Sequence, residues 1–236
     1  VYGILYLTPS DPARLMLGAS APDSALEQLR NELGLNDPFL VQYANYMKGV
    51  LHGDFGISYR SQQSVFLEIE ARLPVTIKLA FSSIIVIAVL GILLGVISAV
   101  KQYSFVDKFL TVFSMCAASI PSFWLGLMLM LLFSLKLGLL PSYGVNSGWK
   151  SYIMPVIALS LPSLAEIIRM TRSAMLDTIH QDYVRTARAK GMQEKRVIFG
   201  QALKNALMPV ITVIGANFGS LLGGSVVIET VFALPG

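Results

Sequence analysis

Long uncharged runs dominate the hydrophobic pattern of the chain. Leu79 to Val100, Phe109 to Leu135 and Asn205 to Ile228 contain no charged residue, and a fourth run, Ser151 to Ala165, continues through mostly apolar positions as far as Arg169. A helix of about 20 largely apolar residues spans the hydrocarbon core of a bilayer. The pattern therefore predicts an all-α fold, a polytopic bundle of membrane helices with these four spans.

The remaining segments have a different pattern. We expect residues 1–8 to be the end of a first membrane helix, because the chain opens on an apolar run, and residues 75–236 to form the transmembrane core. Residues 9–74 are interpreted as an extracytoplasmic segment with two amphipathic helices. One begins at Asp23 or Ser24 and ends at Gly34, and the other covers Pro38 to Leu51. A helical cap is favoured over a binding surface for this segment.

Charge sets the expected orientation, because loops rich in Lys and Arg stay on the cytoplasmic side. Lys101 and Lys108 flank one short loop, and the stretch 169–204 is strongly basic, whereas acidic residues outnumber basic ones in 9–74. We predict that the first two segments lie inside and that 9–74 lies outside. The turn-rich loop Gly138 to Lys150 is also expected outside.

Composition narrows the function classes. The chain is 54% hydrophobic and only 14% charged, with a mean hydropathy of +0.64, which argues against a soluble enzyme. The net charge is +4. The basic residues are concentrated in the loops predicted to be cytoplasmic, which membrane topology explains, so no nucleic-acid partner is expected. Cys116 is the single cysteine, and His52 and His180 fall on opposite sides of the membrane in this topology. We therefore predict no metal site and no catalytic residue.

Two ionisable residues lie within the less apolar span. Glu166 and Arg169 are three residues apart, on one helix face, where they can pair. An internal ion pair is favoured, and the lining of a substrate path or a gate is the alternative. Lys78 and Lys136 lie near span ends, where they are expected to extend to the membrane interface.

Glycines recur at every fourth position in the last span, at Gly215, Gly219 and Gly223, and Gly91 and Gly95 repeat the spacing earlier. Such ridges let helices approach closely. Packing is favoured, and a surface on which helices slide is compatible with the same residues. Asn217 and Ser220 can line an aqueous path.

The basic inner stretch predicts a short helix. Asp182 is a good N-cap residue, and Gly191 is suited to end the helix. A second helical segment, Glu194 to Lys204, then enters the membrane. From composition alone, docking of the short helix into a soluble partner and contact with anionic lipid remain equally favoured.

The inner stretch and several other segments resemble one family. The matching segments are Leu7 to Pro12, Leu33 to Leu35, Gly53 to Ser58, Ile120 to Leu125, Asp182 to Gly191, Ala202 to Pro209 and Glu229 to Gly236. In this order they resemble the permeases of ABC importers, in the branch that transports peptides and nickel. The chain has Arg185-Thr186-Ala187 where the broader family begins Glu-Ala-Ala, and Leu234 where an aromatic residue is common. The first departure is itself similar to the peptide and nickel branch.

The resemblance implies a type I importer transmembrane domain in a prokaryotic cytoplasmic (inner) membrane, with one more helix after Gly236. It implies a permease subunit for peptides or for nickel, free or chelated, and not an enzyme. Its partners would be a homologous second permease, two ATP-binding subunits that hold ATP and Mg, and an extracytoplasmic substrate-binding protein. The chain itself would bind no cofactor. A passive channel and a membrane-embedded enzyme are the alternative functions.

The resemblance also assigns a role to the short inner helix, which would be the helix that couples the permease to the ATPase. The coupling residues would be Asp182, Arg185, Thr186, Ala187, Arg188, Lys190 and Gly191. Ala187 and Gly191 would give it a close-fitting face and a defined end. Its basic side chains would make charged contacts or steer docking.

Overall fold

The computed structural model describes residues 3, 11–18, 20–59 and 61–236. These residues are mostly helical, and within them the only β-type pairing is an isolated antiparallel bridge between Ile57 and Ser64. The predicted all-α fold is confirmed. The chain divides into two compact units, Val1–Leu73 and Pro74–Gly236, which are described separately. Apart from Gly3, the end of a first membrane helix predicted at residues 1–8 lies outside the described residues.

The first unit contains α2 (Pro12–Leu17), α3 (Asp23–Glu32) and α4 (Phe39–Leu51). Asp11 caps α2, because its side chain accepts a hydrogen bond from the Ala13 N–H at 3.1 Å. Arg30 of α3 donates to the same carboxylate at 2.6 Å, which joins the two helices and holds the pKa of Asp11 below its usual value. The two helices predicted in this segment are both present.

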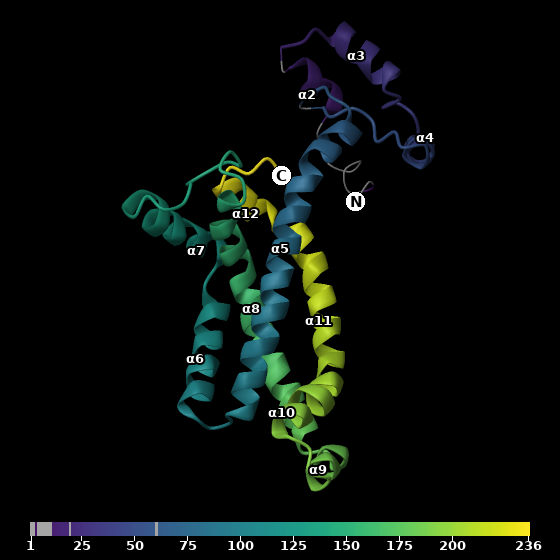
Figure 1. Cartoon of the computed structure of the whole chain (residues 1–236). Coiled ribbons are helices and arrows are strands. Elements are labelled where there is room, and N and C mark those ends of the chain that lie inside the picture. Colours follow the sequence, from purple (N-terminus) through teal and green to yellow (C-terminus); the bar gives the residue numbers. More distant parts are fainter. Residues whose placement is uncertain (1–2, 4–10, 19, 60) are drawn as a thin grey trace. The chain divides into compact units, whose positions relative to one another are not determined.

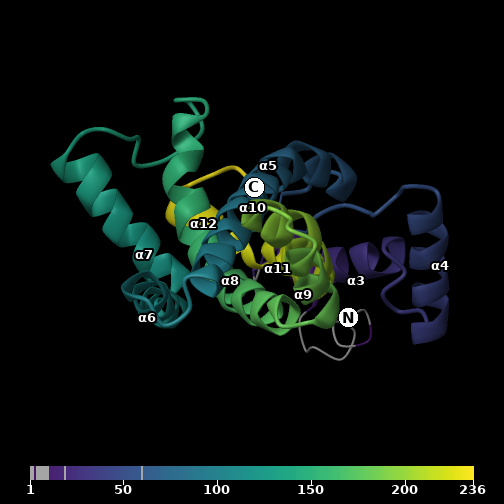
Figure 2. The same ribbon diagram turned by 60° about the horizontal axis from the view of Figure 1, so that its bottom comes forward.

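The second unit is a bundle of helices (Figure 1). Helix α5 (Val65–Val100) begins in the first unit and continues into the second. It is followed by α6 (Phe105–Ser119), α7 (Ser122–Leu129), the π-helix η1 (Met130–Lys136), α8 (Lys150–Ile179), α9 (Asp182–Ala189), α10 (Glu194–Arg196), the π-helix η2 (Val197–Ala202), α11 (Leu203–Gly224) and α12 (Val226–Val231). Helix α8 contacts α6, α7, α11 and α12 (Figure 2). The core of the bundle therefore lies along α8.

Among the described residues, three helices are long and apolar enough to cross a membrane. They are Val65–Val100, Lys150–Ile179 and Glu194–Gly224. The predicted uninterrupted span from Phe109 to Leu135 is wrong, because Phe105–Ser119 and Ser122–Lys136 meet at a bend of 100°. Pro121 lacks a backbone N–H, and Ile120 before it is extended, at φ −85° and ψ 121°. The count reaches four only if this bent pair forms one span.

The last span also differs from its prediction. Its helix starts earlier than Asn205, and α11 ends at Gly224, before the predicted end at Ile228. Two consecutive glycines, Gly223 and Gly224, have low helix propensity, and a separate short helix, α12, follows. One helix therefore ends, and the next begins, just after the glycine-rich part of the span.

Glycines allow α5 to touch α8. A Cβ atom at Gly91 would lie 2.6 Å from Cγ2 of Ile167, and one at Gly95 would lie 2.5 Å from Cβ of Thr171 and 2.8 Å from the Ile168 carbonyl oxygen. Real Cβ atoms do not approach so closely. The shorter of the two predicted glycine ridges therefore packs one helix against another.

The longer glycine ridge has no such neighbour. Cβ atoms at Gly215, Gly219 and Gly223 would have no other described atom within 4 Å, and all three glycines are exposed. Within the described part of this chain no helix packs against this ridge, so its close packing against another helix stays a prediction.

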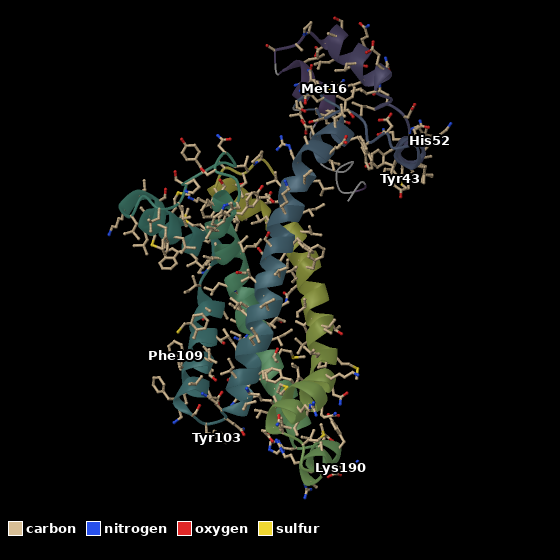
Figure 3. All side chains as sticks on the ribbon, viewed as in Figure 1. Met16, Tyr43, His52, Tyr103, Phe109 and Lys190 are labelled. Atoms are coloured by element: carbon tan, nitrogen blue, oxygen red, sulfur yellow. The ribbon has the colours of Figure 1, made fainter. Side chains whose placement is uncertain are left out.

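The two basic loops lie at the same end of the second unit, where Tyr103 and Lys190 mark them (Figure 3). At the other end, the Gly144 N–H donates to the Phe232 carbonyl at 2.9 Å and joins the loop between η1 and α8 to the residue after α12. The bundle thus separates the segments that the basic-residue pattern assigns to opposite sides.

This arrangement supports a labelling prediction. Single cysteines at Asp37 and Asn146, in a chain whose exposed Cys116 is replaced, should react with a membrane-impermeant thiol reagent in intact cells. A cysteine at Lys195 should react only after the cells are opened. Labelling at position 195 but not at position 37 in intact cells would reverse the orientation.

Candidate functional site

Helix α9 begins and ends close to where the sequence predicts, but with a different cap. Gln181 occupies the N-cap position with φ −70° and ψ 150°, and Asp182 is the first residue of the helix. The prediction of Asp182 as N-cap is therefore wrong by one position. Gly191 follows the helix with φ +74°, a conformation that favours glycine. The predicted glycine stop is confirmed.

One face of α9 is buried within the chain. Val184 is 0% exposed and Ala187 is 7% exposed, and the helix contacts η2. Ala187 therefore packs internally, and its predicted place on a face that fits a partner is wrong. Val184, three residues earlier, lies on the same helix face and explains the inward orientation.

The opposite face of α9 is open. Helical periodicity places Asp182, Arg185, Thr186 and Ala189 there, and all four are exposed, as is Lys190 at the end of the helix. Arg185 and Asp182 lie 3.6 Å apart with largely exposed side chains, so their ion pair adds little stability. This face combines small side chains with charges of both signs.

Two side-chain contacts fix α9 to the following helices. The Asn205 side-chain amide of α11 donates to the Tyr183 hydroxyl at 2.8 Å. The Arg188 guanidinium donates to Glu194 of α10 at 2.8 and 3.2 Å, and these hydrogen bonds raise the pKa of Arg188 above its usual value. These contacts join α9 to α10 and to the start of α11.

Polar side chains also connect α8 to α11. The Asn217 amide donates to Glu166 at 3.1 Å, and the Ser163 hydroxyl donates to the Asn217 side-chain oxygen at 3.3 Å. Arg169 instead donates to the Ser114 carbonyl of α6 at 3.3 Å. The predicted Glu166–Arg169 ion pair is therefore not formed, because each side chain binds a different helix.

The exposed side of α11 presents small and polar residues. Its exposed positions include Gly215, Gly219, Ser220 and Gly223, and Asn217 lies half-buried beside them. The structure therefore brings Asn217 together with Glu166, while Ser220 is exposed and a Cβ atom at Gly215, Gly219 or Gly223 would meet no other described atom within 4 Å.

A buried charge network at the basic end of the bundle is not apparent from the sequence pattern. Asp107 is 3% exposed and accepts two hydrogen bonds from Arg172, at 2.7 and 2.8 Å, one from the Ser98 hydroxyl and one from the Tyr103 N–H. It joins the end of α5 and the start of α6 to α8. The only sequence signal was an acidic residue in the short loop between Lys101 and Lys108.

Replacement of this carboxylate tests the importance of the network. Asp107→Asn should lower the free energy of unfolding by about 3 kcal/mol, because it leaves the Arg172 guanidinium without its charged partner. The expected value is at the lower end of the range for buried pairs, since the Arg172 side chain is 28% exposed. Thermal unfolding in detergent measures the change. Equal stability of Asp107→Asn and wild type would show that the pair is dispensable.

Among the residues the structure describes, no group of three or more His, Cys, Asp or Glu side chains is placed to hold a metal ion. The candidate functional site consists of the open face of α9, its connection to α11, and the polar and small residues along α8 and α11.

Comparison with known proteins identifies the family. Residues 91–236 match the family described as "Binding-protein-dependent transport system inner membrane component", and residues 1–80 match its N-terminal region. The chain is 39% identical over 236 residues to the glutathione transport system permease protein GsiC of Escherichia coli (strain K12), covering 100% of this chain and 77% of that protein. GsiC of Salmonella typhimurium is 40% identical over the same shares of each chain. The chain therefore belongs to the binding-protein-dependent inner membrane transport components, the permeases of type I ABC importers.

Proposed function

We propose that this permease forms the translocation path for small peptides, with glutathione as the first candidate, across a prokaryotic cytoplasmic membrane. The support is the identity of 39% to 40% over the whole chain with permeases named for glutathione. The resemblance noted from sequence motifs included nickel equally, but the names of these relatives favour a peptide.

The proposed assembly contains a homologous second permease, two ATP-binding subunits and an extracytoplasmic substrate-binding protein. In this assembly ATP and Mg are held by the ATP-binding subunits, and the permease binds no cofactor. The family description, which names a binding protein and an inner membrane, supports this composition.

The observation that carries the proposal is the orientation of α9. A helix that lies on a membrane surface needs an exposed apolar face. Helix α9 instead buries Val184 and Ala187 in its own chain, and its open face carries small and charged side chains with no large apolar residue. Docking on a soluble subunit is therefore favoured over lipid contact.

In this proposal the open face of α9 docks on an ATP-binding subunit. Asp182, Arg185, Thr186 and Lys190 make or steer the contact, Arg188 holds α9 in place, and Gly191 ends the helix. Through Tyr183 and Asn205, a movement of the ATP-binding subunit displaces α11.

Helix α11 and its polar contacts to α8 form the proposed path. Glu166, Arg169, Asn217 and Ser220 supply polar groups that can face a peptide. The exposed glycines Gly215, Gly219 and Gly223 permit close approach by the second permease, because no described residue of this chain covers them.

Uptake by the reconstituted importer tests the substrate. With its binding protein and ATP, the complex should accumulate labelled glutathione or dipeptides in vesicles, and an excess of the unlabelled peptide should abolish the signal. The ligand that copurifies with the binding protein should be of the same class. Uptake of nickel salts or nickel chelates with no uptake of peptides would overturn the proposed substrate.

A further inference from the structure

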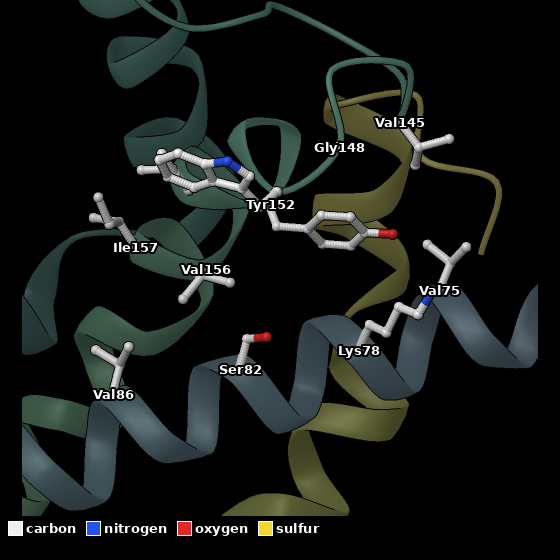
Figure 4. A pocket seen from close by; sticks show the side chains of 11 residues that line it. Val75, Lys78, Ser82, Val86, Val145, Gly148, Tyr152, Val156 and Ile157 are labelled. Atoms are coloured by element: carbon white, nitrogen blue, oxygen red, sulfur yellow. The ribbon is translucent and has the colours of Figure 1, made fainter.

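A cavity of about 840 Å³ lies between the beginning of α8, the loop before it and the outer half of α5. Val75, Val86, Val156 and Ile157 form much of its wall, and its polar side-chain groups include those of Lys78, Ser82 and Tyr152 (Figure 4), besides the indole N–H of Trp149. All these residues belong to the second unit. The cavity is separate from α9 and from the polar contacts between α8 and α11.

The polar groups of the cavity have no partners within the described chain. The Lys78 ammonium forms no ion pair there, and the side-chain hydroxyls of Ser82 and Tyr152 make no hydrogen bond to another described residue. A cation and two hydroxyls that share one cavity can together bind an anionic group such as a phosphate.

The polar side chains Lys78 and Tyr152 reach one end of the cavity, beside Val75 and Val145, and Val86 lies toward the other end (Figure 4). Figure 4 shows the Tyr152 hydroxyl and the Lys78 side chain reaching toward the same end, with Ser82 between them and Val86. Val86 follows Lys78 by two helical turns, so it lies about 12 Å farther along α5. The ligand that fits this arrangement has an anionic head and an apolar tail.

We infer that this cavity binds an anionic phospholipid, with its phosphate at Lys78 and Tyr152 and one acyl chain along Val86, Val156 and Ile157. This inference goes beyond the proposed transport function. A lipid is favoured over a transported peptide because the wall is mainly valine and isoleucine. Trp149 at the cavity rim is 72% exposed, as expected of an aromatic residue at a membrane interface.

Lipid retention by the assembled importer tests the inference. Importers are reconstituted with phosphatidylethanolamine and phosphatidylglycerol, and native mass spectrometry counts the phosphatidylglycerol that stays bound. Lys78→Ala should lower this retention about tenfold, since a charge-assisted hydrogen bond is lost. Lys78→Arg should restore it. A photoreactive acyl chain on phosphatidylglycerol should cross-link to peptides that contain Val86 or Ile157.

A matched control is Lys136→Ala, which removes another interface lysine, at the end of η1 and outside the cavity lining. It should leave phosphatidylglycerol retention unchanged. Equal retention by wild type and Lys78→Ala would overturn the inference. Displacement of the bound lipid by excess glutathione would also overturn it, since the cavity would then belong to the substrate. Cross-linking of the photoreactive lipid elsewhere only would do the same.

Discussion

Gly95→Leu is expected to prevent stable packing of α5 against α8 and to lower the free energy of unfolding by about 3 kcal/mol or more. Even a Cβ atom at this position would lie 2.5 Å from Cβ of Thr171 and 2.8 Å from the Ile168 carbonyl oxygen. The carbonyl belongs to the helix backbone, so it cannot move aside as a flexible side chain can. Yield of folded permease and its unfolding temperature in detergent measure the effect.

Gly219→Leu is the matched control, because no described atom lies within 4 Å of a Cβ atom at that glycine. The same leucine should leave the unfolding temperature of the isolated permease unchanged. It should reduce copurification of the second permease and peptide uptake, since the proposed interface requires small residues. Wild-type assembly and uptake in this variant would indicate that the glycine ridge faces lipid. Equal destabilisation by the two leucines would contradict the packing described above.

Ala189→Arg is expected to reduce copurification of the ATP-binding subunits at least about tenfold, because a long charged side chain would enter the proposed contact. Ala189 is exposed and lies on the face of α9 opposite Val184 and Ala187. Membrane insertion and the unfolding temperature should stay at wild-type values. Binding of the ATP-binding subunits to the detergent-solubilised permease measures the change.

Ala187→Arg distinguishes the two faces of the helix. Ala187 is 7% exposed, so arginine there should lower the stability of the permease itself, through overpacking and a buried charge. If Ala187→Arg weakened binding of the ATP-binding subunits with no loss of stability, the face of α9 that contains Ala187 would be the docking surface, and the described orientation of the helix would be contradicted. If Ala189→Arg bound these subunits normally, the open face would not be the docking surface.

The helical fold could be predicted because membrane spans depend on a local property, the length of an apolar run. The exact ends of the helices and the bends between them are harder to predict from the sequence. The bend at Pro121 had a local signal, since a residue before proline avoids the helical conformation. The uncharged run from Phe109 to Leu135 nevertheless has the length and hydrophobicity of one spanning helix. Hydrophobicity alone does not distinguish a continuous span from two helices that meet at 100°.

The position of α9 in the sequence is predictable, but which of its faces points into the bundle is not. The inner helix and its glycine stop follow from local rules, whereas the inward direction of Ala187 depends on where η2 packs. Spacing of Val184 and Ala187 on one face was the available signal. The two glycine ridges have the same spacing and different surroundings, because their contacts depend on which helix lies opposite. Likewise, the partner of Asp107 is Arg172, which is distant in sequence.

The most direct test of the central claim, that α9 couples this permease to ATP hydrolysis, is peptide uptake by vesicles that contain the complete importer with Gly191→Pro. The Gly191 N–H donates to the Arg188 carbonyl at 2.9 Å, and its φ is +74°. Proline lacks this N–H and requires φ near about −65°, so the turn after α9 cannot form unchanged. We predict ATP-dependent uptake at least about tenfold below wild type, with normal membrane insertion and continued ATP hydrolysis. Wild-type uptake coupled to hydrolysis in this variant would contradict the account, as would uptake by the wild-type permease without ATP and binding protein.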